Sequence, residues 1–281
     1  MRERQPSRTA FGAAGYRAAH QVSDHGRVFA DPFARSILGP EADGIIAALS
    51  ADPRQAPARM FMAARSRFAE DCLAAAVARG VRQAVILGAG LDTFALRNPH
   101  QALGLRVFEV DHPETQAWKL TRLAAAGLAV PESLTFAPVD FEAGGLDSGL
   151  LAVGFTPELP AFFIWLGVVP YLGRSAIAAT LRYLGGLPDA EVVLDYSEPP
   201  ENYRPERRAE FAELGARAAA SGEPWLSHFD PVEMSRELQS HGFGDQEDLS
   251  LDAIAVRYLG APTNDAGASP GPHIVRARRI T

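Results

Sequence analysis

Two glycines and an acid, about twenty residues apart, are the first residues in the sequence whose types and spacing could do chemistry. Gly88 and Gly90 follow the apolar run Val85–Leu87, and glycines at such a turn let the backbone approach a ligand without interference from a Cβ atom. Asp111 lies 21 residues beyond Gly90, after a second apolar run, where a carboxylate can accept the hydroxyl protons of a ribose. The spacing predicts a nucleotide-like cofactor, although a tight β–α turn followed by an acidic helix start would leave the same pattern.

The residue three positions after Gly90 bears on the kind of cofactor. A dinucleotide fingerprint continues to a third glycine, which lets the helix that receives the pyrophosphate pack closely. Thr93 stands at that position here. S-adenosylmethionine has a ribose and no phosphate, so it needs only the close backbone and the acid. The turn therefore favours S-adenosylmethionine and leaves an NAD(P)-dependent oxidoreductase open.

The elements that must position these residues follow residue 82. Short apolar runs alternate with helical stretches there, which is typical of a parallel sheet covered by helices on both faces. The expected strands are Gln83–Leu87, Leu105–Val110, Leu134–Pro138, Ala161–Trp165 and Glu191–Tyr196, with closing strands near Asp252–Tyr258 and His273–Arg279. The helices expected among them are Glu114–Ala126, Ser175–Leu184 and Pro231–His241. In an open α/β sheet, ligands bind outside the carboxyl ends of the strands, where the strand order reverses.

The first eighty residues have helical periodicity and no strand pattern. Helices are expected over Ala10–Val22, Glu41–Ser50 and Pro57–Arg79. We therefore predict an N-terminal helical cap over residues 1–80 and an α/β core over residues 81–281. An insert over residues 197–230 could form a lid above the site.

Composition excludes several classes of protein. A formal net charge of −7 disfavours nucleic acid as a partner. The single cysteine, Cys72, excludes an internal disulfide, and no cluster has the spacing of metal ligands. The most apolar stretch, Leu159–Leu172, is 14 residues long and contains two prolines, which is too short and too broken to span a bilayer. The polar N-terminus lacks the apolar region of a signal peptide, so a soluble cytoplasmic protein is expected.

Motifs along nearly the whole chain resemble the leucine carboxyl methyltransferase superfamily, specifically its bacterial branch of O-methyltransferases that act on small molecules. The matching motifs are Asp31–Ala34, Ala64–Phe68, Val85–Arg97, Phe108–Pro113, Val139–Phe141, Gly167–Leu172 and Gly222–Trp225. The resemblance implies a class I methyltransferase, a Rossmann-like fold of seven mostly parallel strands with an antiparallel last strand, that binds S-adenosylmethionine.

The resemblance also implies roles for individual residues. Arg65 matches the arginine that pairs with the methionyl carboxylate of the cofactor, where a guanidinium can bind in a bidentate way. Gly88 and Gly90 match the loop that contacts the cofactor. Asp111 matches the acid that binds the ribose hydroxyls, with Glu109 as a weaker candidate for that role.

Three further positions concern the adenine and a departure from the family. Asp140 and Phe141 match an Asp-Leu pair beside the adenine, where Phe replaces Leu at an apolar wall. Leu166 stands where other family members have a glutamate after the fourth strand. A leucine neither accepts a hydrogen bond nor receives a proton, which leaves open a noncatalytic, regulatory protein that binds S-adenosylmethionine.

The acceptor and any general base are less well indicated. A carboxylate acceptor is already ionised at neutral pH, whereas a hydroxyl acceptor usually needs a base within hydrogen-bond reach. The candidate bases are His112, His228, Tyr171 and Tyr203, and the sequence assigns none of them as catalytic. We expect methylation of a carboxylate or hydroxyl oxygen on a small molecule. The sequence does not indicate the oligomeric state.

Overall fold

A seven-stranded sheet forms the centre of the computed structural model, which describes residues 8–141, 145–220, 222–262 and 269–280. The strands are β1 (Gln83–Leu87), β2 (Arg106–Asp111), β3 (Leu134–Pro138), β4 (Ala161–Trp165), β5 (Glu191–Ser197), β6 (Phe243–Leu249) and β7 (Pro272–Arg279). Their order across the sheet is β3-β2-β1-β4-β5-β7-β6. Only β7 runs antiparallel to its neighbours, β5 and β6. This arrangement confirms the expected sheet with an antiparallel last strand.

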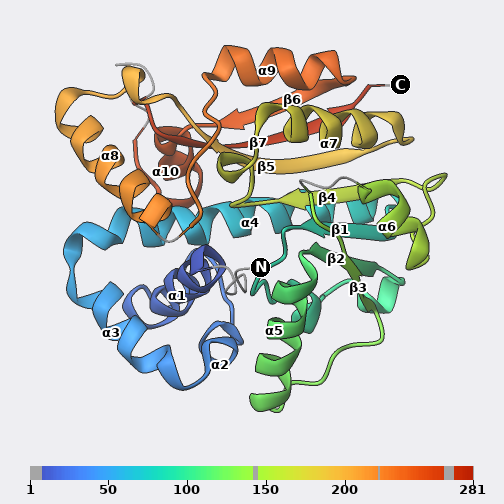
Figure 1. Cartoon of the computed structure of the whole chain (residues 1–281), viewed down its shortest axis with the longest axis horizontal. Coiled ribbons are helices and arrows are strands. Elements are labelled where there is room, and N and C mark those ends of the chain that lie inside the picture. Colours follow the sequence, from blue (N-terminus) through green and yellow to red (C-terminus); the bar gives the residue numbers. More distant parts are fainter. Residues whose placement is uncertain (1–7, 142–144, 221, 263–268, 281) are drawn as a thin grey trace.

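Ten α-helices surround the sheet in the described part of the chain (Figure 1). They are α1 (Arg8–Ser23), α2 (Ala34–Leu38), α3 (Ala42–Ala51), α4 (Ala56–Ala78), α5 (Pro113–Ala125), α6 (Leu146–Ala152), α7 (Arg174–Gly186), α8 (Pro205–Ala220), α9 (Pro231–Ser240) and α10 (Leu251–Leu259). The six helices expected from periodicity correspond to α1, α3, α4, α5, α7 and α9, with bounds that differ by one or two residues.

Alternate residues of the central strands pack into two separate cores, as side chains on opposite faces of a strand must. On one face, Val85, Phe163 and Leu194 pack with buried residues of α6, α7 and α9. On the other face, Ile86 and Ile164 pack with α4 and α10. Figure 1 shows α7 and α9 on one side of the strands and α4 on the other. All five residues of β1 and of β4 are buried, which explains the apolar sequences of residues 84–87 and 161–165.

The N-terminal helices connect to the rest of the molecule in two ways. A third apolar cluster joins α1, α2 and α3 to Leu91, in the glycine turn, and to Leu123 of α5. Helix α4 belongs to the sheet's own core, because Phe68 and Leu73 are buried against the strands. The division at residues 80 and 81 into cap and core stays a prediction.

One expected strand is wrong. Residues 252–258 form part of helix α10, and the sixth strand lies earlier, at Phe243–Leu249. The Ser250 side chain accepts a hydrogen bond from the Ala253 N–H and so caps the start of the helix, and Gly260, directly after its last residue, has a φ of 68°. The actual strand, β6, is the edge strand beside β7, and only its first and last residues are buried. Its polar sequence therefore lacks the apolar pattern of a strand.

The strand order places a switch point between β1 and β4. The chain builds outward from β1 through β2 to β3, then returns to the other side of β1 to form β4. From the carboxyl end of β1 the chain continues toward β2, and from that of β4 it continues toward β5 on the other side of β1, so a crevice opens at these ends. The glycine turn leaves β1, and Leu166–Val168 leaves β4, so both lie at this crevice.

Candidate functional site

A cavity of about 750 Å³ lies at the carboxyl ends of β1, β2 and β4. Its walls come from seven parts of the chain that lie far apart in the sequence. The lining residues include Arg17, Arg65, Gly88, Gly90, Asp111, Asp140, Phe141, Leu166, Tyr171 and Glu223. The cavity thus brings together Arg65, Gly88, Gly90, Asp111, Asp140 and Phe141, which are the six predicted cofactor-binding residues.

The backbone of the glycine turn, residues 88–90, lines the cavity. Gly88 has a φ of 66°, and a Cβ atom placed on it would lie 2.3 Å from Cγ2 of Val168. Gly90 has a φ of 47°, and its Cβ would lie 2.7 Å from Cβ of Ala10. Both positions combine a left-handed backbone with a contact that no side chain could share. The turn therefore keeps the backbone exposed to the cavity.

Asp111 ends β2 beside this turn. Its Oδ2 accepts a hydrogen bond from the Gly90 N–H at 2.6 Å, and its Oδ1 accepts one from the His112 N–H at 2.7 Å. Burial raises the pKa of Asp111 although these two N–H groups oppose the change. Each carboxylate oxygen has a second lone pair, so the group is held in place and can still accept from a ligand.

Arg65 extends from α4 to the loop that follows β4. Its Nη1 donates to Oδ2 of Asp195 at 2.6 Å, and both side chains are nearly buried. A Cβ atom on Gly167 would lie 3.0 Å from Arg65 Nη2, so the guanidinium packs directly against the loop that follows β4. A planar guanidinium at the edge of a cavity is suited to bind a ligand carboxylate.

Asp140 and Phe141 follow β3 and complete the Asp111 end of the cavity. The N–H of Val139, just before them, donates to the carbonyl of Asp111 at 2.9 Å, which places this loop beside the end of β2. Glu109, the weaker ribose candidate, is absent from the described cavity lining. It is 1% exposed and paired with Lys119 at 2.5 Å, and burial raises its pKa to about 7. Its neighbours give Glu109 a structural role beneath α5.

The four candidate bases occupy different surroundings. His112 lines the cavity, but its Nδ1 accepts the Glu114 N–H and caps α5. Tyr171 also lines the cavity, and burial raises its pKa. Within the described residues, the lining includes neither His228 nor Tyr203.

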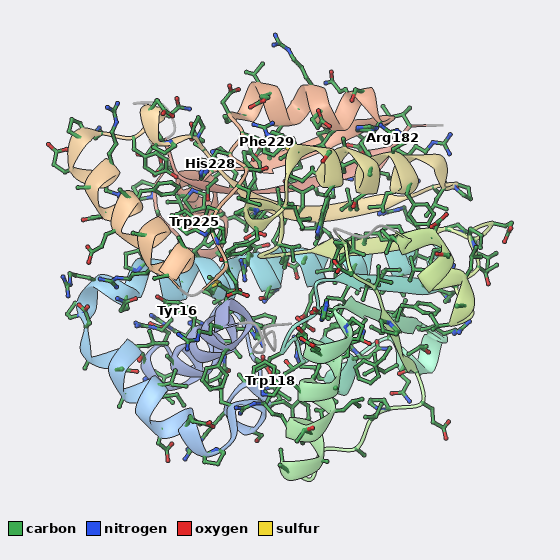
Figure 2. All side chains as sticks on the ribbon, viewed as in Figure 1. Tyr16, Trp118, Arg182, Trp225, His228 and Phe229 are labelled. Atoms are coloured by element: carbon green, nitrogen blue, oxygen red, sulfur yellow. The ribbon has the colours of Figure 1, made fainter. Side chains whose placement is uncertain are left out.

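These two residues belong to an aromatic group in the segment that was expected to form a lid. The Phe211 ring lies 4.9 Å from that of Tyr203, 4.8 Å from that of Trp225 and 5.4 Å from that of His228, centre to centre. Figure 2 labels Trp225 and His228 beside α8. Burial lowers the pKa of His228. The group therefore stabilises the predicted lid, and Tyr171 and His112 are the two candidates that reach the cavity.

Three residues in or beside the cavity were not among the site residues expected from the sequence. Arg17 lines the cavity, and its guanidinium donates to the Leu91 carbonyl at 2.7 Å and to Asp31 at 2.9 Å. Glu223 lines the cavity and accepts the Thr9 N–H at 3.0 Å. Asp195 accepts a hydrogen bond from Arg65. Asp31 and Glu223 lie in motifs that resemble the family, so these motifs could have indicated them. Asp195 lies within β5 and outside all of these motifs, so no sequence signal indicates it.

Other kinds of site are not seen in the described residues. No group of three or more His, Cys, Asp or Glu side chains there could hold a metal ion. No helix in that part of the chain is long and apolar enough to cross a membrane. Cys72 is buried in the core between α4 and the sheet, and burial raises the pKa of its thiol to about 12, so it is a poor nucleophile.

The sheet order, the glycine turn after β1 and the acid after β2 define an S-adenosylmethionine-dependent methyltransferase of class I. Residues 10–185 match the model of the leucine carboxyl methyltransferase family, and the chain belongs to this family. This membership excludes the NAD(P)-dependent oxidoreductase that the glycine turn alone left open.

Two relatives agree with this assignment, and a solved structure shares the fold. YktD of Bacillus subtilis, provisionally named an S-adenosyl-L-methionine-dependent methyltransferase, is 35% identical over 76% of this chain and 71% of its own. A Mycobacterium tuberculosis protein with the same provisional function is 30% identical over 97% of this chain and 94% of its own. The crystal structure of a DUF574 family protein from Streptomyces avermitilis shares the fold, with a TM-score of 0.57, 18% identity and coverage of 94% and 97%.

Proposed function

We propose that the chain methylates a carboxylate oxygen of a small molecule, with S-adenosylmethionine bound across the glycine turn. The observation that carries the proposal is one cavity that is lined by the Asp111 carboxylate beside the glycine turn, by the Arg65 guanidinium beside the loop after β4, and by a mixture of apolar and polar side chains. The two charged groups match the ribose hydroxyls and the methionyl carboxylate of the cofactor. Apolar side chains with a few polar groups among them suit a small organic acceptor.

The proposed roles of the cofactor residues follow from their surroundings. Asp111, already held by two backbone N–H groups, would accept the ribose hydroxyls. Arg65 would bind the methionyl carboxylate, and the backbone at Gly88 and Gly90 would lie against the cofactor. Asp140 and Phe141 would contact the adenine. When bound, S-adenosylmethionine supplies an activated methyl group to a nucleophile in line with the sulfur.

The walls supplied by other segments support a largely apolar acceptor. Ala13 of α1, Met62 of α4, Leu172, Pro224 and Leu226 all line the cavity. Such side chains exclude water, and holding the nucleophile, methyl group and sulfur in line is the main contribution an enzyme makes to methyl transfer. The segment over residues 197–230 contributes two of these residues, which supports its proposed role as a lid.

The protonation states and hydrogen bonds of the polar lining residues favour a carboxylate acceptor. Because burial raises its pKa, Tyr171 keeps its proton at neutral pH and can donate to an acceptor oxygen, but it cannot take up a proton. His112 Nδ1 already accepts the Glu114 N–H at the start of α5. A carboxylate needs no base, so the available groups suffice for it.

Glu223 favours a second acceptor, a hydroxyl. It lines the cavity, and the one hydrogen bond described for it reaches Oε2. A carboxylate with a free oxygen can accept the proton of a hydroxyl nucleophile. In that case Glu223 would be the base, and Glu223→Gln would remove turnover while preserving cofactor binding.

Product chemistry distinguishes the two acceptors. The purified protein is incubated with S-adenosylmethionine labelled in its methyl group and with matched panels of small carboxylic acids and phenols. We expect label in a small-molecule product that mild alkali releases as methanol, because a methyl ester hydrolyses under these conditions. An alkali-stable ether whose formation requires Glu223 would contradict the carboxylate and support the hydroxyl. Label on a protein fraction would contradict both.

A further inference from the structure

Asp195, near the end of β5, holds two parts of the cavity wall without belonging to that wall. It is 6% exposed, and both of its carboxylate oxygens are engaged. Oδ2 accepts from Arg65 Nη1 at 2.6 Å, and Oδ1 accepts from the Gly167 N–H at 2.5 Å. Among the described residues, Arg65 and Gly167 line the cavity but Asp195 does not. It therefore acts on the cavity through these two neighbours.

The guanidinium of Arg65 is confined between the carboxylate and the loop. A Cβ atom on Gly167 would lie 3.0 Å from Nη2 and 3.2 Å from Nη1 of Arg65. An arginine side chain loses much conformational freedom when it is fixed. Contacts that fix it before a ligand arrives remove this cost from binding. Asp195 thus aims the remaining donors of Arg65 at the cavity in advance.

A buried cation also needs a counterion, because an unpaired buried charge is costly. The residue that precedes Gly167 is Leu166, an apolar side chain on the cavity wall. The carboxylate that stabilises Arg65 comes instead from the neighbouring strand, β5. With charge balanced by Asp195, Arg65 can remain at the cavity edge when no ligand carboxylate is present.

We propose that Asp195 is the positioning residue for Arg65 and thereby sets the affinity of the site for the carboxylate end of the cofactor. This inference rests on the proposed role of Arg65 toward that carboxylate. It goes beyond that role by assigning a residue that does not touch the cofactor. It predicts an effect on ligands that have the amino-acid portion and no effect on ligands that lack it.

The test compares two ligands in calorimetric titrations of the full chain. S-adenosylhomocysteine has the carboxylate, whereas 5′-methylthioadenosine retains the adenosine and the sulfur but lacks the amino-acid portion. Asparagine has one oxygen for two donors, so Asp195→Asn must leave either Arg65 or Gly167 without its acceptor. We expect Asp195→Asn to weaken S-adenosylhomocysteine about tenfold (about 1.4 kcal/mol) and to change 5′-methylthioadenosine by less than about twofold.

A matched control and a second variant separate positioning from folding. Asp24 forms a similarly buried pair with Arg59 at 2.6 Å, and neither residue is among the described cavity lining. Asp24→Asn should change the affinity for neither ligand. If Asp195→Asn does not fold, Gly167→Ala displaces the guanidinium while keeping the Asp195 charge, and the same selective loss is expected.

The outcomes distinguish this inference from the function on which it rests. An equal loss of both ligands in Asp195→Asn would overturn positioning, because the residue would then support the fold in general. Unchanged binding in Asp195→Asn, with a selective loss in Arg65→Ala, would overturn positioning and leave the proposed function standing. No selective loss in Arg65→Ala would refute the role of Arg65, and the inference would be refuted with it.

Discussion

At the scale of single residues, backbone atoms at the glycine turn matter as much as side chains. Gly88 is constrained twice, by a φ of 66° and by Val168, whose Cγ2 would lie 2.3 Å from an added Cβ. Val168 belongs to the loop that follows β4, so the glycine lets the loops of two neighbouring strands meet. The cavity wall at the turn depends on this close approach.

A pair of substitutions separates backbone strain from crowding at this turn. Gly104 has a φ of 80°, and an added Cβ would meet nothing within 4 Å. Gly104→Ala should lower the free energy of unfolding by about 1–2 kcal/mol, the cost of a left-handed backbone, and leave affinity for S-adenosylhomocysteine unchanged. Gly88→Ala should lose more stability and bind at least about tenfold more weakly. Urea unfolding and calorimetry measure both quantities, and equal effects of the two variants would refute the crowding argument.

At the scale of elements, α4 both covers the sheet and delivers Arg65. Its buried residues include Phe68, Leu73 and Val77, which pack against the strands, and Ala64 and Arg65, which precede them on the same helix. The position of Arg65 therefore depends on how tightly α4 packs on the sheet. This packing makes α4 part of the main core.

Truncation of a buried leucine tests the packing of α4. Leu73 is fully buried, so Leu73→Ala should lower the free energy of unfolding by about 2–5 kcal/mol. Leu214 of α8 is 50% exposed, and Leu214→Ala should change stability by no more than about 0.5 kcal/mol. Urea unfolding provides the comparison. A cost for Leu73→Ala as small as that for Leu214→Ala would show that α4 packs loosely.

A buried histidine joins the ends of β5, β6 and β7. His273 Nδ1 lies 2.8 Å from Asp248 Oδ1, and its Nε2 lies 3.2 Å from Glu198 Oε1. Burial alone would lower the pKa of His273, but its hydrogen bonds and charge interactions with Asp248 and Glu198 raise it above its ordinary 6.5. The folded state therefore binds this proton more tightly than the unfolded state.

The sign of this shift determines a pH dependence of stability. The contribution of His273 is fully present below its ordinary pKa and is lost as pH rises through the raised folded value. His273→Gln should therefore cost more unfolding free energy at about pH 6 than at about pH 9. Urea unfolding of both proteins at the two pH values measures the difference. An equal cost at both would show that folding does not raise the pKa of His273.

The elements differ in how well the sequence predicts them. The buried strands β1, β2, β4 and β5 are largely apolar, and the glycine turn and Asp111 lie at a spacing that local sequence reveals. Strand β6 was missed because its edge position leaves polar residues exposed on most of its length. Asp195 was missed because its role depends on a contact with Arg65, 130 residues earlier in the chain. Local patterns contain no information on such contacts.

At the scale of the whole molecule, the cavity exists only once distant segments have met. The N–H of Thr9, at the start of α1, donates to Glu223, 214 residues later, at 3.0 Å. Arg65 comes from α4, Asp111 from β2 and Gly88 from the turn after β1, and all three line one cavity. The central claim is that this cavity binds S-adenosylmethionine by its ribose and its methionyl carboxylate.

Calorimetric titration of the full chain with S-adenosylmethionine tests this claim most directly, with Asp111→Ala, Arg65→Ala and the exposed control Asp43→Ala measured alongside. We predict saturable binding by the wild-type protein and by Asp43→Ala, weakened at least about tenfold by each of the other two substitutions (about 1.4 kcal/mol). Thermal unfolding confirms that each variant is folded. A folded wild-type protein that does not bind, or binding that neither Asp111→Ala nor Arg65→Ala weakens, would contradict the claim.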